Sequence, residues 1–364
     1  MKSTKWLWYA CVLVAIGSSG ACDDSASVRR NTAFVALDAS YHYTCGRTAD
    51  GTVYCWGKFY DDDSVLSADE PTRVQTPAPF AQISVGWAHQ CGLTQSGEAY
   101  CWGKAGWNLL GTGDEPFDGV VEIPVRVAGD ARYSMIDAGI GMTCGVALPD
   151  GQLWCWGGVE SPQPEQRWAR GGFVKVASGR DVGGCAIDVD SRLWCWGTAL
   201  TGEAPDSLVN VAPVMRFRDI TVGGWDLHAC AVSIDRTAYC WGRNWQGSLG
   251  DGTGADEIPT PTAVATSHRY ETVQTFSWMT CGLTVEGNVD CWGYRPDTGD
   301  GPNQRSDVPI TVSNGLVFES VSVGMDYFCG LVQGGRVYCL GNPWSFGQEA
   351  SPRSTVPVRI PDPQ

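Results

Sequence analysis

A thirteen-residue segment recurs seven times along this chain, and it constrains the fold more than any other feature. It is clearest from Cys91 to Gly103, where it reads C-G-L-T-Q-S-G-E-A-Y-C-W-G. The copies span residues 45–57, 91–103, 144–157, 185–197, 230–242, 281–293 and 329–341. Their first cysteines are 46, 53, 41, 45, 51 and 48 residues apart. A period in the forties, built from short apolar runs, is typical of β-propellers and related repeat arrays.

Each copy predicts a β-hairpin that carries one cysteine on each strand. In six copies the cysteines are ten residues apart, equally far from a three-residue turn such as Ala49-Asp50-Gly51. The third turn position needs a left-handed backbone, which glycine adopts without steric cost. Ser191 and Arg236 stand there in copies four and five, so we expect strain or a different turn. Copy three has one extra residue in its turn.

This symmetry places the two cysteines of a hairpin opposite one another, within reach of a disulfide. Disulfides in turn indicate an oxidising compartment. Zinc binding is not expected, because the chain has no C-x-x-C and only four histidines. The expected pairs are Cys45–Cys55, Cys91–Cys101, Cys144–Cys155, Cys185–Cys195, Cys230–Cys240, Cys281–Cys291 and Cys329–Cys339.

The hairpin register also predicts a layer of aromatic rings. The residue after the first cysteine faces the residue before the second, and in six copies a glycine or alanine faces Tyr or Trp. Asp290 and Leu340 depart from the pattern, so we expect less regular packing in blades six and seven. The tryptophan of C-W-G lies on the same side, in a core between sheets or, alternatively, in a ligand-stacking wall. These tryptophans are Trp56, Trp102, Trp156, Trp196, Trp241 and Trp292.

A strand precedes each hairpin, and a loop and a strand led by proline follow it. The clear proline-led strands are 71–74, 124–127, 309–312 and 357–360. Three or four antiparallel strands per repeat indicate an all-β fold, a seven-bladed propeller with one cysteine hairpin per blade. We expect one domain over residues 32–364, with its two ends meeting at one seam. The blade that owns the proline-led strand is left open.

Residues 1–21 are predicted to be a signal peptide. Lys2 and Lys5 are followed by an apolar run over 6–16 and by the small residues of a cleavage site. Cys22 is the one cysteine of the mature chain without a hairpin mate, and lipid attachment would remove its free thiol. We therefore expect a bacterial lipoprotein of the cell envelope, acylated at Cys22 and tethered by residues 22–31. Ordinary cleavage to a soluble exported protein is the alternative.

The formal net charge of −15 argues against nucleic acid and anionic membrane surfaces as partners. Membrane contact is expected through the lipid alone, and the protein is expected to be a monomer. No cofactor is expected. Calcium at Asp251–Asp256 is a weak alternative, because the spacing of its oxygens fits no strict loop motif.

The repeats resemble the regulator of chromosome condensation repeat family. The resemblance is carried by Gly86-Trp87-Ala88-His89-Gln90-Cys91, by the W-G step and by Gln246-Gly247-Ser248-Leu249-Gly250-Asp251-Gly252-Thr253. It covers nearly the whole mature chain and implies a propeller. The added cysteine pairs are similar to those of an exported bacterial branch. His89 and His228, the surviving histidines of the motif, are expected to be structural.

The resemblance implies binding rather than catalysis, since exported relatives include an inhibitor of β-lactamases. We therefore expect a non-enzymatic scaffold for a protein or glycan partner, with proteinaceous inhibition of an enzyme as a variant. A carbohydrate-active hydrolase or lyase is the alternative, using carboxylates in the loops at 61–63, 114–118, 251–257 and 297–300. Aromatic residues just after C-W-G are the candidate binding residues, with a packing role as the alternative. They are Tyr60, Trp107, Trp245 and Trp344.

Overall fold

The computed structural model of the chain describes residues 33–59, 64–113, 119–158, 161–180, 183–224, 228–295, 305–347 and 354–363. The expected signal peptide, Cys22 and the whole tether over residues 22–31 lie outside these residues. Among the helices of the described part, none has the length and apolar character needed to span a bilayer.

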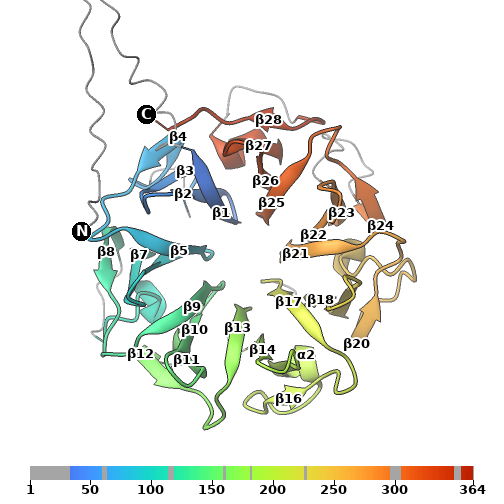
Figure 1. Ribbon diagram of the computed structural model, residues 1–364, viewed down its shortest axis with the longest axis horizontal. Coiled ribbons are helices and arrows are strands. Elements are labelled where there is room, and N and C mark those ends of the chain that lie inside the picture. Colours follow the sequence, from blue (N-terminus) through green and yellow to red (C-terminus); the bar gives the residue numbers. More distant parts are fainter. Residues whose placement is uncertain are drawn as a thin grey trace, which may run out of the picture.

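The described residues form seven four-stranded antiparallel sheets, and each sheet follows chain order. Figure 1 shows the sheets as blades around a central axis, with the first strand of each blade innermost and the fourth outermost. The predicted seven-bladed propeller is thus confirmed, with four strands in every blade.

The strands of each blade are counted from the central axis outward, and the first three form the inner part of the blade. In blades one to seven the first strands are β1 (Phe34–Ser40), β5 (Phe80–Val85), β9 (Tyr133–Ala138), β13 (Phe173–Ser178), β17 (Phe217–Val222), β21 (Tyr270–Phe276) and β25 (Phe318–Val323). The second strands are β2 (Tyr43–Thr48), β6 (His89–Thr94), β10 (Thr143–Ala147), β14 (Gly184–Asp188), β18 (His228–Ser233), β22 (Met279–Thr284) and β26 (Tyr327–Val332). The third strands are β3 (Val53–Gly57), β7 (Ala99–Lys104), β11 (Gln152–Gly157), β15 (Leu193–Trp196), β19 (Ala238–Arg243), β23 (Val289–Tyr294) and β27 (Arg336–Gly341).

The fourth strands are β4 (Ala68–Arg73), β8 (Val120–Arg126), β12 (Ser161–Gln166), β16 (Val209–Asn210), β20 (Glu257–Ala263), β24 (Arg305–Thr311) and β28 (Val358–Arg359). Short helices lie between third and fourth strands, namely η1 (Gly106–Asn108), α2 (Thr198–Thr201), η2 (Trp245–Gly247) and η4 (Pro343–Phe346).

The cysteine hairpins have the predicted register. Cys45 faces Cys55 and Gly46 faces Tyr54, and the extra residue of copy three lies in its turn, beyond the pair Ala147 and Gln152. The Cα atoms of each cysteine pair are 4.0–4.1 Å apart. All seven predicted disulfides are present, one in each blade.

The hairpin turns in which another residue replaces glycine at the third position have the same conformation as the turns with glycine. Gly51 has φ 86°, while Ser191 and Arg236 have φ 62° and 69° at the same position. The backbone N–H of Gly51 donates to Thr48 O, and the N–H of Ser191 likewise donates to Asp188 O. Of the two expectations for these copies, the same turn with a strained left-handed residue is therefore the one observed.

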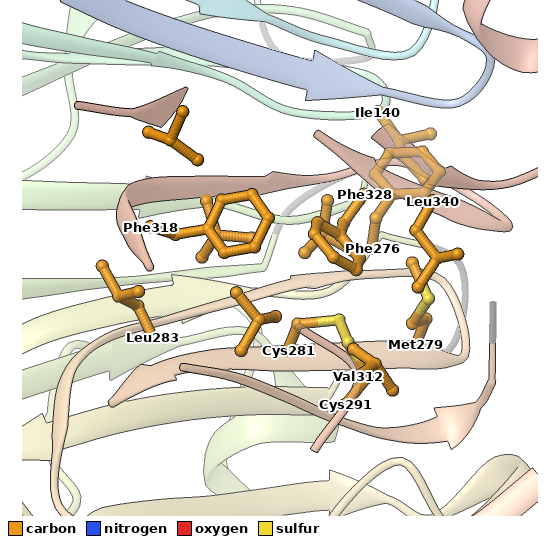
Figure 2. Close-up of a cluster of buried hydrophobic side chains, with 14 residues drawn as sticks. Ile140, Phe276, Met279, Cys281, Leu283, Cys291, Val312, Phe318, Phe328 and Leu340 are labelled. Carbon is orange, nitrogen blue, oxygen red and sulfur yellow. A yellow bond between two sulfur atoms is a disulfide. The ribbon is translucent and has the colours of Figure 1, made fainter. Parts of the chain in front are cut away.

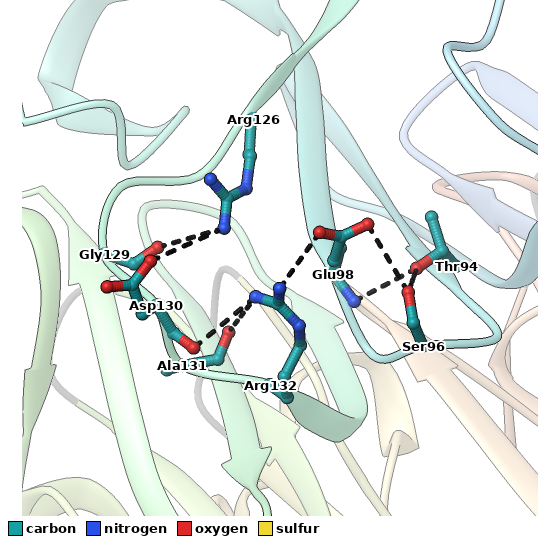
Figure 3. A network of polar contacts seen from close by, with 8 residues as sticks. All are labelled: Thr94, Ser96, Glu98, Arg126, Gly129, Asp130, Ala131 and Arg132. Atoms are coloured by element: carbon teal, nitrogen blue, oxygen red, sulfur yellow. Dashed lines mark hydrogen bonds and ion pairs between the residues drawn. The ribbon is translucent and has the colours of Figure 1, made fainter.

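Polar contacts join the hairpin turn of blade two to the next blade, as Figure 3 shows. Thr94 Oγ1 accepts a 3.1 Å hydrogen bond from the N–H of Glu98 across the turn. The Glu98 carboxylate then pairs at 3.0 Å with Arg132, which leads into blade three. The turn is therefore fixed both within its blade and against its neighbour.

The aromatic layer is a core between neighbouring blades, not a ligand wall. All six tryptophans of C-W-G have 0% exposure. The small residue after the first cysteine makes room for the ring at the start of the first strand, because a Cβ on Gly46 would lie 2.5 Å from Phe34 Cδ1. That ring contacts both Tyr54 and Trp56, at centroid distances of 6.0 and 5.7 Å.

The two exceptions to the layer are accommodated. Leu340 is fully buried in the cluster of blades six and seven that Figure 2 shows, together with Phe318 and the Cys281–Cys291 disulfide. Asp290 is also fully buried and accepts hydrogen bonds from the Tyr270 hydroxyl and the Thr311 hydroxyl, in a group that His268 completes.

The prediction that each fourth strand begins at its proline is wrong. Strands β4, β8 and β24 begin several residues before their prolines, whereas β28 is shorter than residues 357–360. Each fourth strand pairs only with the third strand of the preceding cysteine hairpin, which settles its blade. The fourth strand is the edge strand of its blade, where a proline is tolerated although it has no N–H to donate. A proline can therefore lie inside this strand and does not mark where the strand begins.

The ring closes between blades seven and one, and neither blade contains a strand from the other end of the chain. This agrees with the prediction that the two chain ends meet at one seam. The N–H of Ala39 donates to Ser322 Oγ at 2.8 Å across this seam. The hydroxyls of Thr44 and Tyr327 are also hydrogen-bonded at 2.8 Å. Side-chain contacts therefore close the propeller.

Candidate binding face

The loops after the first and third strands of a blade emerge at the same end of the propeller, because the strands alternate in direction. We call this end the loop face, and the end with the cysteine-hairpin turns the hairpin face. In blade one the two loops touch, since the N–H of Lys58 donates to His42 O at 2.7 Å. The candidate residues after C-W-G therefore lie on the loop face.

Trp107 is 54% exposed on this face. Its ring stacks on Trp87, with centroids 5.7 Å apart and planes inclined by 12°. Both Trp107 and Asn108 have left-handed backbones, with φ 60° and 57°. Such conformations are costly for residues other than glycine, and they gather where function requires a side chain in one place.

Trp87 continues a row of rings that crosses three blades. Its centroid is 6.3 Å from that of Tyr41, which is 4.2 Å from that of His42. His42 in turn lies 4.9 Å from Trp344 of blade seven. We call Trp107, Trp87, Tyr41, His42 and Trp344 the aromatic row.

The row rests on a fixed backbone. The N–H of Trp87 donates to Gly139 O of blade three, and the N–H of Met325 in blade seven donates to Tyr41 O. His42 Nδ1 lies 2.7 Å from Ser345 Oγ and 3.6 Å from the carboxylate of Asp326. Burial opposes ionisation of Asp326, yet hydrogen bonds from His42, Asn342 and Ser345 hold its pKa below the usual value.

The other candidate residues have different surroundings. Tyr60 lies outside the described residues. Trp245 is 55% exposed but stands first in its short helix, whereas Trp107 stands second in the corresponding turn. One position rotates a side chain far around a helix axis, so Trp245 borders a separate groove beside Arg305 and Asp307 of blade six. From the sequence, Trp107 and Trp245 fall into one group of candidate residues, but they lie at different places on the loop face.

The two motif histidines are structural. His89 and His228 are fully buried, and their Nε2 atoms lie 2.6 and 3.1 Å from the hydroxyls of Thr143 and Thr280 in the next blades. Burial lowers the pKa of His89 to about 3 and that of His228 to about 4. Both rings are therefore neutral at physiological pH and join neighbouring blades.

Two carboxylates that the sequence did not single out face the central channel. Asp38 and Asp137 line a cavity of about 240 Å³, which Ile140 bounds near Gly224 across the channel. Burial, reinforced for Asp38 by the nearby charge of Asp137, raises the pKa of Asp38 to about 7, and burial raises that of Asp137 to about 6. A shared cavity and raised pKa values are what an acid–base pair requires.

Their hydrogen bonds indicate a structural role instead. Asp38 Oδ2 accepts the N–H of Val85 in the next blade at 2.7 Å, and Asp137 Oδ2 accepts that of Ser178 at 2.6 Å. Hydroxyls of Ser84, Thr221 and Ser322 accept the N–H of Ala138, Thr275 and Ala39 from the same strand position. The two carboxylates are therefore members of a clamp that recurs at five of the seven blade junctions.

The loop carboxylates give little support to catalysis or calcium binding. Those at 61–63, 114–118 and 297–300 lie outside the described residues. The carboxylate of Asp251 accepts hydrogen bonds from the N–H and hydroxyl of Thr253, as in an ordinary polar turn. Across the residues that the structure describes, no group of three or more His, Cys, Asp and Glu side chains is arranged to hold a metal ion.

The comparisons with known proteins agree with this architecture. Residues 34–61 and 80–107 match the regulator of chromosome condensation (RCC1) repeat. No curated protein matches the chain. Prp20p from Saccharomyces cerevisiae is 16% identical, with a TM-score of 0.73 over 91% of this chain and 88% of that one.

Two further solved structures are similar. Human WBSCR16 is 17% identical over 84% of this chain and 90% of its own, with a TM-score of 0.69. The ectodomain of the Arabidopsis thaliana receptor kinase ACR4 is 19% identical over 90% and 98%, with a TM-score of 0.58. At these identities the likeness shows the fold, a seven-bladed propeller, and two of its repeats are similar to the regulator of chromosome condensation repeat.

Proposed function

We propose that this protein is a non-enzymatic scaffold that binds a protein partner through the aromatic row of its loop face. The observation that carries the proposal is the exposed Trp107 ring stacked on Trp87. Tryptophan is enriched among residues whose truncation weakens protein interfaces most. Related propellers support the proposal, since Prp20p binds Gsp1p and histones and has been crystallised with Kap60.

A crosslinking experiment tests which face binds. A photo-reactive benzoylphenylalanine replaces Trp107 in one variant and Val189, a 70% exposed residue of the hairpin face, in the other. In native envelope extract we expect a discrete adduct from position 107 and none from position 189, with the position-107 adduct lost on adding Trp87→Ala. Equal labelling from both positions would contradict a loop-face interface.

The enzyme alternative has weaker support. The channel carboxylates accept hydrogen bonds from neighbouring blades, and Prp20p, a propeller of similar fold, binds Gsp1p and histones. Inhibition of an enzyme would be one form of protein binding and would use the same face. We therefore infer that the protein binds the surface of a partner protein and does not convert a substrate.

We further propose that the protein is exported and is anchored by a lipid on Cys22. The seven disulfides support an oxidising compartment, where they persist. Cys22 lies outside the described residues, so the anchor rests on the sequence alone. Cys22→Ser should move the protein from the membrane fraction to the soluble fraction, followed by immunoblot. A wild-type protein already soluble and unacylated by mass spectrometry would rule the anchor out.

A further inference from the structure

A groove lies on the loop face, away from the aromatic row. This groove, of about 820 Å³, separates the loop after β19 in blade five from the start of β24 in blade six. Its side chains include Trp245, Gln246, Asp256, Arg305 and Asp307. The volume lies within the range of small-ligand sites, about 300–1,000 Å³.

The walls of this groove are held in place. Asn244 is buried and crosslinks the loop, since its Oδ1 accepts the N–H of Leu249 at 3.0 Å and its Nδ2 donates to Ala255 O at 2.7 Å. The N–H of Gly252 donates to Asp307 O at 2.9 Å, which ties blade five to blade six. Trp245 is thus presented by a fixed loop rather than by a free one.

The corresponding place between blades two and three lacks all three key side chains. Backbone hydrogen bonds establish the correspondence, because Ala105 N donates to Gly119 O as Asn244 N donates to Asp256 O. In the same way Gly113 N donates to Pro162 O as Gly252 N donates to Asp307 O. Gly106, Gly119 and Pro162 therefore stand where blades five and six have Trp245, Asp256 and Asp307. The fold does not require these three residues, so another reason is needed for their presence together.

The chemistry of the groove favours a saccharide. Trp245 is 55% exposed and supplies a flat apolar surface, and the groove has no aliphatic side chain among the described residues that line it. Asp256 and Asp307 accept hydrogen bonds, Arg305 donates them and Gln246 does both, as hydroxyl groups require. A protein anchor would need an apolar pocket, and an anion would meet two carboxylates for one guanidinium.

We propose that this groove is a saccharide-binding site, in which a sugar ring lies on Trp245 and its hydroxyls bond to Asp256, Asp307 and Arg305. The site is separate from the aromatic row and does not depend on the protein partner. Trp107 is a matched control, because it is exposed to the same extent on the same face.

The purified mature protein is applied to a printed array of neutral, N-acetylated and uronic oligosaccharides, and the tightest binder is then titrated by calorimetry. We expect Trp245→Ala and Asp307→Asn to weaken that binding at least about tenfold, with Trp107→Ala unchanged. The crosslink from position 107 should survive Trp245→Ala, so the two sites can fail separately. Melting temperatures of all variants are measured alongside.

Three results would overturn the proposal. The first is absence of binding to any arrayed saccharide at protein concentrations up to about 1 mM. The second is an equal loss of binding in Trp107→Ala and Trp245→Ala. The third is release of new reducing ends from the bound saccharide, which would show catalysis in place of binding.

Discussion

Asp38 shows how the channel carboxylates affect stability. Its Oδ1 and Oδ2 hold the N–H groups of Ala39 and Val85, but burial keeps its pKa near 7, above the ordinary value of 3.8. A raised pKa in the folded state means that ionisation disfavours folding. The stability associated with the protonated form is fully present below about pH 4 and is lost as pH rises through 7.

Asp38→Asn is therefore expected to stabilise the protein at alkaline pH. Asparagine keeps an oxygen for the N–H of Val85 and carries no charge. We expect the free energy of unfolding to rise by about 1–3 kcal/mol at pH 8 and by little at pH 4. Urea unfolding at pH 4, 6 and 8 measures the difference from wild type.

The control for this variant is Asp50→Asn. Side-chain and backbone hydrogen bonds from Thr48 and Thr52 lower the pKa of Asp50, so its ionised form favours folding. Asp50→Asn should give no gain at pH 8. A gain from Asp38→Asn that is the same at pH 4 and pH 8 would exclude titration as its cause.

At the scale of the element, the cysteine hairpin keeps its turn even without glycine. Ser191 holds φ 62° where Gly97 holds φ 80°, in turns with the same backbone hydrogen bond to the third residue before. Register, disulfide and flanking strands together impose the turn on the residue. A left-handed residue other than glycine costs of order 1 kcal/mol or more.

Ser191→Gly should stabilise the protein by about 0.5–1 kcal/mol, because relief of backbone strain exceeds the added flexibility of the unfolded chain. The reverse change, Gly97→Ser, should destabilise it. Chemical unfolding of both variants gives the two signs. If Ser191→Gly lowered stability, the turn would not be strained at this position.

At the scale of the whole molecule, the disulfides strengthen blades but do not join them. In the described part of the chain every disulfide lies within one cysteine hairpin, and blades meet through buried rings and through the clamps at their inner strands. The seam between blades seven and one alone lacks a chain connection. It depends on contacts such as that of Tyr327 with Thr44.

Tyr327→Phe should open the molecule locally at this seam. Loss of its hydroxyl leaves Thr44 without that partner and costs about 1 kcal/mol. Native-state hydrogen exchange should speed up in β1, β2, β25 and β26, with blades three to five unchanged. A uniform increase across all blades would mean that the ring opens as one unit and not at the seam.

The repeating unit can be predicted from the amino-acid sequence. Hairpin register and disulfides follow from cysteines ten or eleven residues apart, because strand pairing over so short a turn is a local matter. The number of blades and the ends meeting at one seam follow from the same repetition.

Which side chains of different repeats lie together depends on how the blades pack against one another. Alternation along a strand does not show that Asp38 and Asp137 share a channel, since they are far apart in sequence and belong to blades one and three. It also does not show that one step along a turn directs Trp107 to the aromatic row and Trp245 to the groove. The physical reason is that the inclination and contacts of neighbouring blades are set by packing between repeats, which a pattern within one repeat does not contain.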